Sequence, residues 1–584
     1  MRTFPIWRIK YLALVLLFSS GLDATTKQTS DDIAPESGTA KTAKQAVKAQ
    51  DFIIAAAHPL ATQAGFDVLK HNGNAIDAMV TVQAVLGLVE PQSSGLGGGA
   101  FLLYYDQNQQ QLRSFDGRET APLNAPGNLF MSANATPMAF FDAVVGGRSV
   151  GTPGTVKLLW DTHQTFGRHK WSALLAPAIK LAREGFKVSP RLANAIQKDR
   201  DKLRSDPVTS RYFFPDGQAL KAGQTLRNPD YAKTLTMLAK YGGDYFYQQN
   251  FSKQIANKVQ HADKPGYLSS KDFEAYRVIE RKPVCSAYRD YQICGMGPPS
   301  SGALSVNATL GMLQSIPLKD LSPSEPLAWH YIAEASRLAF ADRGMYIADP
   351  DFITVPTGLL STPYLAARAK RIHPTQSSKN IQPGRPPNVA PNQYQPARSP
   401  EQDSTTHFVI VDQDKNIVSM TSTIENGFGS RLMVNGFLLN NELTDFSFAP
   451  TKNGALVANR VQAGKRPRSS MAPTIVFKGD TPYLALGSPG GSRIINYLTN
   501  SLIAILDWNM DLQQAFNLPH IVNRFGTMDI EEDTRATSLT DRFEQMGYKT
   551  SVRNLNSGLH GVQFSANGMI GAADSRREGL VLGQ

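Results

Sequence analysis

The sequence predicts a layered α/β protein, and three observations lead to that prediction. Residues 59–89 carry apolar side chains at helical spacing, and residues 101–106 (F-L-L-Y-Y-D) have the composition of a strand. Residues 405–411 and 417–423 are two further strand-like runs, with apolar residues on both faces. Strands with two apolar faces lie buried between layers, so other elements must cover both sides.

Length and composition indicate a large globular protein. The chain has 584 residues, 41% of them hydrophobic and 19% charged, which is too long for one simple core. We therefore expect two or more domains or one large composite fold. The net charge of +11 comes from basic residues scattered along the chain. No zinc-finger, RNP or basic-helix pattern accompanies them, so no nucleic-acid partner is predicted.

The N-terminus has the features of a secretory signal. A short basic stretch precedes an apolar run over residues 11–22, which is too short to span a bilayer comfortably. We predict a signal peptide over 1–24, cleaved near Ala24, and hence a secreted, periplasmic protein with no stable membrane span. The alternative is a retained membrane anchor. Residues 25–50 are polar and poor in aromatics, which predicts a disordered lead-in.

The chain has two cysteines, Cys285 and Cys294, on either side of a predicted Tyr-Arg-Asp turn. In a hairpin they would lie opposite each other, so in an oxidising compartment they are candidates for a structural disulfide. Their spacing fits neither a zinc site nor a redox motif. No metal or organic cofactor is predicted.

A proline-rich stretch precedes the two buried strands. Residues 374–400 contain seven prolines, so we predict a flexible tail over 374–404 without helix or sheet. Residues 412–416 (D-Q-D-K-N) then form the turn of a hairpin. An antiparallel register centred near Asp414 places Thr405 opposite Thr423, with Thr421 close by.

Two short motifs have weak support. G-L-G-G-G-A at 95–100 fits a dinucleotide fingerprint, but a strand follows it where that fingerprint requires a helix, so we expect a tight glycine turn. G-R-S-V-G at 147–151 fits a serine nucleophile elbow. The Thr-Pro-Gly that follows opposes the helix an elbow needs, so we expect Ser149 to lie in a turn.

Thr405 fits one particular chemistry. A threonine hydroxyl is a poor nucleophile unless a base takes its proton. The chain's own α-amino group, with a pKa of about 7.7–8.0, is such a base, but only once the peptide bond before the threonine is cut. A cleavage site between Ser404 and Thr405, in an exposed segment, would allow the Thr405 hydroxyl to make that cut itself.

Eight motifs in order then resemble the gamma-glutamyltransferase (gamma-glutamyl transpeptidase, glutathione hydrolase) family of N-terminal-nucleophile hydrolases, over about residues 51–582. They are N-A-I-D-A (74–78), S-G-L-G-G-G-A-F (94–101), F-D-G-R-E-T-A-P (115–122), G-P-P-S-S-G (297–302), S-T-T-H-F (404–408), N-N-E-L-T-D-F-S (440–447), K-R-P-R-S-S-M-A-P-T (465–474) and G-S-P-G-G-S-R (487–493). The resemblance implies a four-layer αββα sandwich, an α/β (α+β) fold. It also implies a precursor cut into a large subunit, 51–404, and a small catalytic subunit, 405–584, which form a heterodimer.

The resemblance also assigns catalytic roles. Thr405 matches the autoprocessing and catalytic threonine, and Thr423 matches the threonine whose hydroxyl binds the nucleophile's amine. Gly490 and Gly491 match the backbone donors of the oxyanion hole, where a glycine backbone approaches closely. The alternative for this glycine pair is a simple turn. Thr406 and His407 are expected to be packing or hydrogen-bonding residues of the strand.

The remaining matches form a pocket for a free amino-acid head group. Arg118 suits a bidentate grip on an α-carboxylate. Ser469 and Ser470 match donors to that carboxylate. Glu442 and Asp445 match the acidic partners of the α-ammonium, although without the flanking motif a solvated surface pair would be the better interpretation.

Two departures from the family pattern bear on specificity. Glu425 stands where many members have asparagine, which adds a negative charge near the ammonium site. The segment between Asp445 and Lys465 looks shorter than in members with a lid and lacks the lid tyrosine, which predicts a more open site.

The first hypothesis is therefore a self-cleaving enzyme that cleaves the γ-glutamyl amide of glutathione or related compounds. A γ-glutamyl ester forms on Thr405 and is resolved by water or an amino acid or peptide acceptor. A glutaryl- or cephalosporin-type acylase on the same scaffold is the second hypothesis. The third is an unprocessed, non-enzymatic envelope-binding protein.

Overall fold

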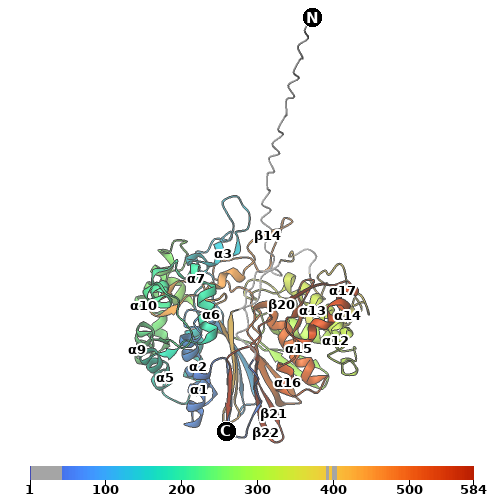
Figure 1. The fold of residues 1–584 in the computed structure, drawn as a ribbon, viewed down its shortest axis with the longest axis horizontal. Coiled ribbons are helices and arrows are strands. Elements are labelled where there is room, and N and C mark those ends of the chain that lie inside the picture. The colour runs from blue at the N-terminus through green and yellow to red at the C-terminus, as the bar shows by residue number, and fades with distance from the viewer. Residues whose placement is uncertain (2–41, 390–393, 398–403) are drawn as a thin grey trace.

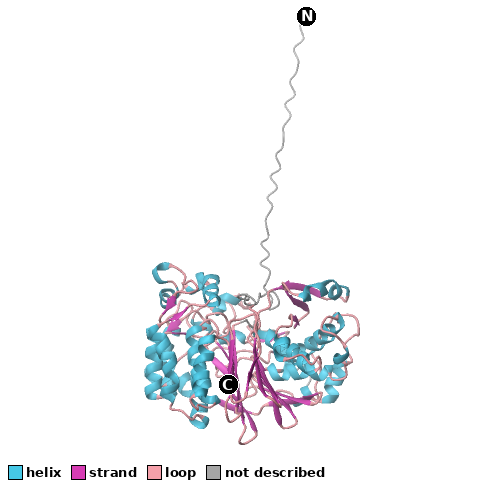
Figure 2. Cartoon of the chain, turned by 60° about the horizontal axis from the view of Figure 1, so that its bottom comes forward, coloured by secondary structure: helices cyan, strands magenta, loops and turns pink. Residues whose placement is uncertain are grey.

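Two seven-stranded antiparallel sheets form the centre of the molecule (Figures 1 and 2). The first runs β1 (Val47–Ala49), β22 (Gly568–Ala573), β21 (His560–Ser565), β17 (Thr481–Gly487), β16 (Thr474–Lys478), β9 (Tyr291–Gly295) and β8 (Val284–Tyr288). The second runs β23 (Leu580–Gly583), β2 (Ile53–Ala56), β10 (Thr405–Val411), β11 (Ile417–Thr423), β3 (Gly99–Asp106), β4 (Gln111–Gly117) and β7 (Ile279–Arg281). Every neighbouring pair within the two sheets is antiparallel.

A group of helices covers the outer face of each sheet, on opposite sides of the strands in Figures 1 and 2. Against the second sheet lie α1 (Pro59–Lys70), α2 (Ala75–Val89) and α4 (Thr155–Phe166), joined by α5 (Trp171–Glu184), α9 (Pro229–Tyr241) and α10 (Gln249–Gln260). Against the first lie α12 (Gly302–Leu313), α15 (Ile494–Leu506) and α16 (Leu512–Phe516), joined by α13 (Pro326–Tyr346) and α14 (Thr362–Ala369).

Shorter elements complete the described chain. The short helices are α3 (Phe140–Val144), α6 (Pro190–Lys198), α7 (Arg200–Leu203), α8 (Pro207–Phe213), α11 (Ser270–Ala275) and α17 (Thr540–Gln545). The small sheets are β5 (Phe186–Lys187) with β6 (Thr225–Leu226), β12 (Met433–Val434) with β13 (Phe437–Leu438), β14 (Thr451–Lys452) with β15 (Ala455–Leu456), and β18 (Ile521–Asn523) with β19 (Thr527–Glu531) and β20 (Lys549–Arg553).

Apolar side chains from both sheets meet between them. Val409, Val411 and Ile417 of the second sheet pack in one buried cluster with Ile475 and Ala485 of the first. Alternate residues of the same strands, such as Phe408 and Val418, belong to the cluster that packs against the helices. The predicted αββα sandwich is therefore confirmed, and the double-sided apolar pattern of β10 and β11 follows from their burial between two layers.

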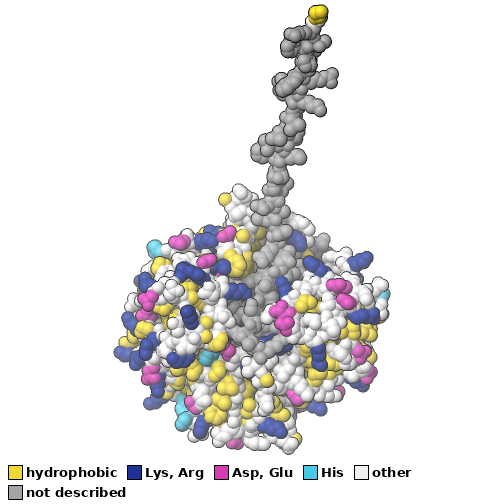
Figure 3. All heavy atoms as spheres, viewed as in Figure 1, with side chains coloured by type: hydrophobic (Ala, Val, Ile, Leu, Met, Phe, Trp, Pro, Cys, Tyr) yellow, Lys and Arg dark blue, Asp and Glu magenta, His cyan; other side chains and the backbone are white. Residues whose placement is uncertain are grey.

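The computed structural model describes Met1 and residues 42–389, 394–397 and 404–584. The predicted signal beyond Met1, residues 25–41 of the predicted lead-in, and residues 390–393 and 398–403 of the predicted tail lie outside them. Among the described residues, no helix has both the length and the apolar character needed to cross a membrane. On the face drawn in Figure 3, Lys and Arg side chains are spread among acidic ones.

The end of the predicted disordered lead-in differs from expectation, because Val47–Ala49 forms β1 at the edge of the first sheet and pairs with β22. Backbone hydrogen bonds to a neighbouring strand, which composition does not reveal, order this segment. Lys44 also donates to the carbonyl oxygens of Arg577 and Gly579. The described parts of the 374–404 tail contain neither helix nor strand, but Gln395 forms an isolated β-bridge with Val457 and Ala397 donates to the carbonyl oxygen of Gly344.

Cys285 on β8 and Cys294 on β9 lie directly opposite each other and form a disulfide. The loop they close is short, so the chain-entropy model gives the bond about 2–3 kcal/mol of stabilisation. Reduction of the protein is therefore expected to lower its free energy of unfolding by about that amount, measured by denaturant unfolding with and without reductant. A Cys285→Ser, Cys294→Ser double variant is the control. Reductant should not destabilise it further, and a wild type equally insensitive to reductant would contradict the prediction.

Candidate active site

The hairpin of β10 and β11 brings Thr405 and Thr423 together at one end of the central sheet. The two residues are register partners, as predicted, and His407 faces Thr421 on the same side of the hairpin. The Thr405 hydroxyl donates to Thr423 Oγ1 at 3.2 Å, and the Thr423 hydroxyl donates to the carbonyl oxygen of Ser404 at 2.7 Å. One buried hydroxyl thus links the Thr405 side chain to the carbonyl of the peptide bond before it.

The site residues proposed from sequence surround one cavity. Its lining comprises Arg118, Thr405, Thr423, Glu425, Glu442, Asp445, Ser469, Ser470, Met471, Gly491 and Ile494. They come from segments on both sides of residue 404, including the end of β4, the 3₁₀ turn Glu442–Asp445 and the start of α15. Residues that are far apart in the sequence therefore meet at one cavity, as is typical of ligand sites.

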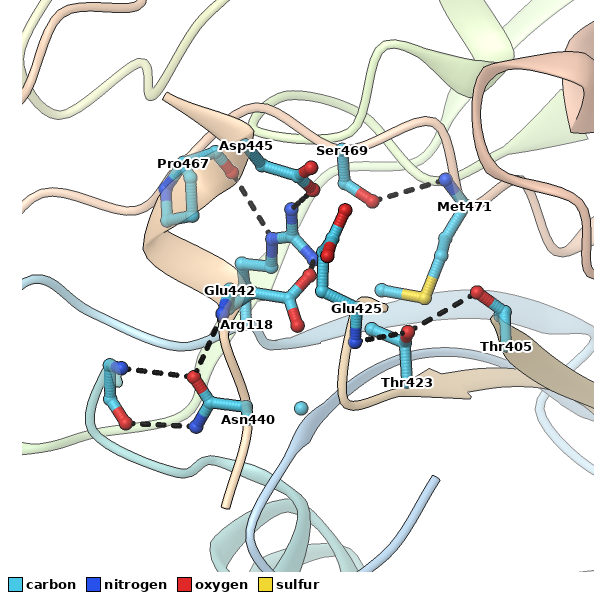
Figure 4. Close-up of polar contacts among 12 residues, drawn as sticks. Arg118, Thr405, Thr423, Glu425, Asn440, Glu442, Asp445, Pro467, Ser469 and Met471 are labelled. Carbon is cyan, nitrogen blue, oxygen red and sulfur yellow. Dashed lines mark hydrogen bonds and ion pairs between the residues drawn. The ribbon is translucent and has the colours of Figure 1, made fainter. Parts of the chain in front are cut away.

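Arg118 is the charged centre of this cavity and is 1% exposed. Its guanidinium binds Glu442 and, at 2.5 Å, Asp445, as Figure 4 shows. It also donates to the carbonyl oxygens of Pro467 and Arg468. Burial by itself lowers the pKa of Arg118, but Glu442 and Asp445 outweigh that effect and hold the pKa above its usual value.

The cavity is small. Its volume is about 20 Å³, enough for about one water molecule. The small volume has a physical cause, because the Arg118 guanidinium pairs with Glu442 and Asp445 inside the cavity. The prediction that the short 446–464 segment leaves the site more open than in members with a lid stays a prediction. A zwitterionic head group would have to exchange these ion pairs, its carboxylate taking Arg118 and its ammonium taking Glu442 and Asp445.

Ser469 and Ser470 lie on a loop that accepts hydrogen bonds from the G-P-P-S-S-G motif at residues 297–302. Ser301 donates to the carbonyl oxygen of Ser469 through both its backbone N–H and its hydroxyl, each at 2.7 Å. The Ser300 hydroxyl donates to the carbonyl oxygen of Met471 at 2.6 Å. Ser470 itself accepts from Arg343 on α13 at 2.8 Å. The motif at 297–302 therefore positions the loop and does not line the cavity.

Gly490 and Gly491 lie at the turn before α15, with φ of +133° and +54°. These are left-handed values that favour glycine. A Cβ at Gly490 would also lie 2.6 Å from the ring of Tyr497. Gly491 lines the same cavity as Thr405, so the backbone of this turn borders the Thr405 side chain.

Glu425 adopts φ of +77°, which is unusual for a residue with a side chain. Its backbone N–H donates to Thr423 Oγ1 at 2.9 Å, so this backbone conformation fixes the Thr423 hydroxyl. Its carboxylate accepts from the Asn441 side chain. Glu425 therefore adds a negative charge to the cavity wall while its backbone supports the threonine pair.

The two weak motifs have structural roles. None of the described glycines over 95–99 has positive φ, so the predicted reason for them, conformational freedom, was wrong. They allow close packing instead: a Cβ at Gly98 would lie 2.0 Å from the carbonyl oxygen of Thr423. Ser149 is buried in a 3₁₀ turn and donates to Val144 at 2.6 Å, in agreement with the turn interpretation.

Sequence reasoning missed three residues around this site. Asn440 bridges the Glu442 turn to Gly97 and Gly151, and Asn441 holds Glu425. Glu119 is fully buried beside Glu442; burial and then the charge of Glu442 raise its pKa well above the usual value, which favours its neutral form. The sequence could have indicated them, because Asn440, Asn441 and Glu119 belong to the motifs at 440–447 and 115–122 that resemble the family.

A pair of sheets between two helical layers, with a threonine at the start of a central strand, is the fold of the N-terminal-nucleophile hydrolases. A family model described as gamma-glutamyltranspeptidase matches residues 61–584. The chain belongs to the gamma-glutamyltranspeptidase family, which confirms the resemblance stated above.

Individual relatives agree with this membership. A glutathione hydrolase proenzyme of Bacillus subtilis (strain 168) is 37% identical over 554 residues, 92% of each chain. One of Escherichia coli (strain K12) is 33% identical over 543 residues, 91% of each chain. Among solved structures, the crystal structure of cephalosporin acylase from Bacillus halodurans matches with a TM-score of 0.82 at 25% identity, covering 94% of this chain and 99% of that one.

Proposed function

We propose that this protein is a self-cleaving γ-glutamyl hydrolase and transpeptidase that acts on glutathione and related γ-glutamyl compounds. The main support for this proposal is that two groups of residues lie in one cavity. The Thr405–Thr423–Ser404 hydrogen-bond chain lies at one side, and Arg118 with Glu442 and Asp445 lies at the other. The first suits cleavage of an amide, and the second suits the charged head group of a free amino acid.

Self-cleavage begins with attack of Thr405 Oγ1 on the carbonyl carbon of Ser404. The new C–O bond forms, the C–N bond breaks, and the hydroxyl proton passes to the departing nitrogen. The Thr423 hydroxyl, already donating to that carbonyl oxygen, stabilises the negative charge that develops there. Water then hydrolyses the ester, which leaves a carboxylate on Ser404 and a free α-amine and hydroxyl on Thr405.

The strand order is compatible with two products that stay together. The second sheet alternates segments from before and after the bond: β10 lies between β2 and β11, and β11 pairs with β3. The first sheet likewise joins β9 to β16. A cut at Ser404 breaks no strand, so we propose a heterodimer of a large subunit ending at Ser404 and a small one starting at Thr405.

Catalysis then reuses the same hydroxyl. The α-amine of Thr405 takes the hydroxyl proton, Oγ1 attacks the γ-carbonyl carbon of the donor, and the C–N bond breaks as the proton passes to the leaving amine. Gly490 and Gly491 supply backbone donors to the oxyanion. Water or the amine of an amino acid or peptide attacks the resulting ester and returns Thr405 to its free form. No step in this scheme uses a metal or organic cofactor.

An acylase for glutaryl or cephalosporin side chains is the second candidate, favoured by the structural match to a cephalosporin acylase. Glutaryl donors lack the α-ammonium. Glu442 and Asp445 share Arg118 as their cationic partner, so a donor whose carboxylate takes Arg118 must bring a second cation for them; the α-ammonium of a γ-glutamyl donor is such a cation.

Two chromogenic anilides that differ only in the α-amino group separate the candidates. We expect kcat/KM for γ-glutamyl 4-nitroanilide to exceed that for glutaryl 4-nitroanilide by about 100-fold or more, because the charged hydrogen bonds to Glu442 and Asp445 are lost with glutaryl. A preference for the glutaryl anilide would assign the acylase function. Cleavage of neither would favour the non-enzymatic hypothesis.

We also propose export to an oxidising compartment, which in a bacterium with two membranes is the periplasm. The signal-like sequence at the N-terminus and the Cys285–Cys294 disulfide support it, since disulfides persist where the surroundings are oxidising.

A further inference from the structure

Lys465 is a buried cation that the proposed mechanism does not use. The residue is 0% exposed. Its ammonium donates to the carbonyl oxygen of Ala458 at 2.7 Å and to Gln462 Oε1 at 2.9 Å, which are both neutral acceptors. Within the part of the chain that the structure describes, no carboxylate forms an ion pair with it. Burying a cation without an anionic partner is unfavourable.

The surroundings of Lys465 disfavour its charged form. Burial has the larger effect and Arg460 the smaller one, and together they lower the pKa of Lys465 to about 7, while Asp349 acts in the opposite direction. A methionine of similar length would fill the same space without the cost of burying a charge. Packing alone therefore favours an apolar side chain here, and a lysine indicates a further role.

The backbone of Lys465 joins two of the segments that form the head-group site. The N–H of Ala121, on the segment that follows Arg118, donates to the carbonyl oxygen of Lys465 at 2.8 Å. The N–H of Gly464 donates in turn to the carbonyl oxygen of Ala121 at 3.0 Å. The chain after Lys465 then continues directly into the loop that carries Ser469.

The ammonium of this lysine adds the acidic segment. Its acceptor Ala458 precedes Asn459, whose Nδ2 donates to the carbonyl oxygen of Asp445 at 2.7 Å. The Oδ1 of Asn459 accepts from the N–H of Arg468 at 3.0 Å, one residue before Ser469. One buried side chain thus connects the acidic side of the site to its serine side.

We propose that Lys465 is a positioning residue that fixes Asp445 relative to Arg118 and so controls recognition of the donor's α-ammonium. The inference rests on the proposed γ-glutamyl function and deepens it. Lys465 does not line the catalytic cavity, so it acts through Ala458 and Asn459. Without the ammonium, the turn at 457–460 loses the donor that holds it. The Asp445 carboxylate then moves away from the position that suits an ammonium.

The test compares γ-glutamyl 4-nitroanilide with glutaryl 4-nitroanilide, which differ only in the α-amino group. The measured quantity is the ratio of the two kcat/KM values within each variant, so that a general loss of activity cancels. Lys465→Met should lower this ratio about tenfold, mainly through KM for the γ-glutamyl donor. Self-cleavage should persist, because the Thr405–Thr423–Ser404 chain does not include this segment. A purely structural role would lower the activity toward both donors and leave the ratio unchanged.

A second variant covers the case in which Lys465→Met does not fold. Gln462→Met removes one of the two acceptors of the ammonium at a half-buried position, and it should lower the ratio by a smaller factor. Lys44→Met is the matched control. The Lys44 ammonium also donates to two backbone carbonyl oxygens, those of Arg577 and Gly579, and burial lowers its pKa to about 8. Since Lys44 has no contact with the head-group segments, its replacement should leave the ratio unchanged.

The outcomes separate the positioning role from the proposed function. An unchanged ratio in folded Lys465→Met, or in Gln462→Met where Lys465→Met does not fold, would overturn the positioning role and leave the γ-glutamyl function standing. An equal fall in Lys44→Met would also overturn it. A wild type that cleaves neither anilide, or that prefers the glutaryl one, would overturn the proposed function itself.

Discussion

Replacing Thr405 with alanine is expected to leave the chain uncut and to lower γ-glutamyl hydrolysis by about 10⁴-fold or more. The alanine removes the atom that we propose attacks both the Ser404 carbonyl and the donor. The Thr423 hydroxyl still donates to the Ser404 carbonyl, so the scissile bond stays polarised but has no nucleophile. A denaturing gel should show one band near the 63.8 kDa of the full chain, less any removed signal.

Thr406→Ala is the matched control for this variant. Thr406 is the next residue of β10, equally buried, and its hydroxyl points to Glu90 at 3.4 Å and not to Thr423. The Thr406→Ala protein should be cut and active, with a stability loss of about 1 kcal/mol. If Thr405→Ala were still cut, or if Thr406→Ala also stayed whole while folded, Thr405 would not be the nucleophile.

Arg118→Lys is expected to lower kcat/KM for γ-glutamyl 4-nitroanilide by about 100-fold, mainly through KM. Lysine keeps one positive charge near Glu442 and Asp445 but cannot grip a carboxylate bidentately. Self-cleavage should persist, because the Thr405–Thr423–Ser404 chain does not include Arg118. A neutral residue would be a poorer test, since two buried carboxylates without a cation cost about 3–5 kcal/mol and endanger folding.

The control for Arg118→Lys lies on the preceding strand. Arg113 of β4 pairs with Glu280 near the surface, so Arg113→Lys changes the same side chain outside the cavity and should leave KM unchanged. Kinetics and a gel on both variants give the result. An unchanged KM in Arg118→Lys, or a loss of self-cleavage equal to the loss of binding, would contradict the separate roles assigned to the two sides of the cavity.

The hairpin shows what the sequence alone predicts well. The strands 405–411 and 417–423 and the pairing of Thr405 with Thr423 follow from local patterning, because a short turn fixes the register of the strands it joins. The four-layer arrangement did not follow from patterning, since the strands of each sheet come from distant parts of the chain. It was predicted from the family resemblance, and the structure confirms it.

The contacts inside the cavity could not be predicted from the sequence. The family resemblance predicted that Arg118, Glu442 and Asp445 bind a zwitterion, but not that they bind one another in this structure. The requirement for glycine at 97 and 98 comes from the approach of Leu438 and Thr423, which are far away in the sequence. Contacts of this kind depend on packing between distant segments, and no local pattern encodes them.

The most direct test of the account is the N-terminal sequence and intact mass of the chains in purified wild-type protein. We expect two chains, and the smaller, of about 20 kDa, should begin with a free α-amine at Thr405 in the sequence T-T-H-F-V. A single uncut chain in folded, active protein, or a small chain that begins at any other residue, would contradict it.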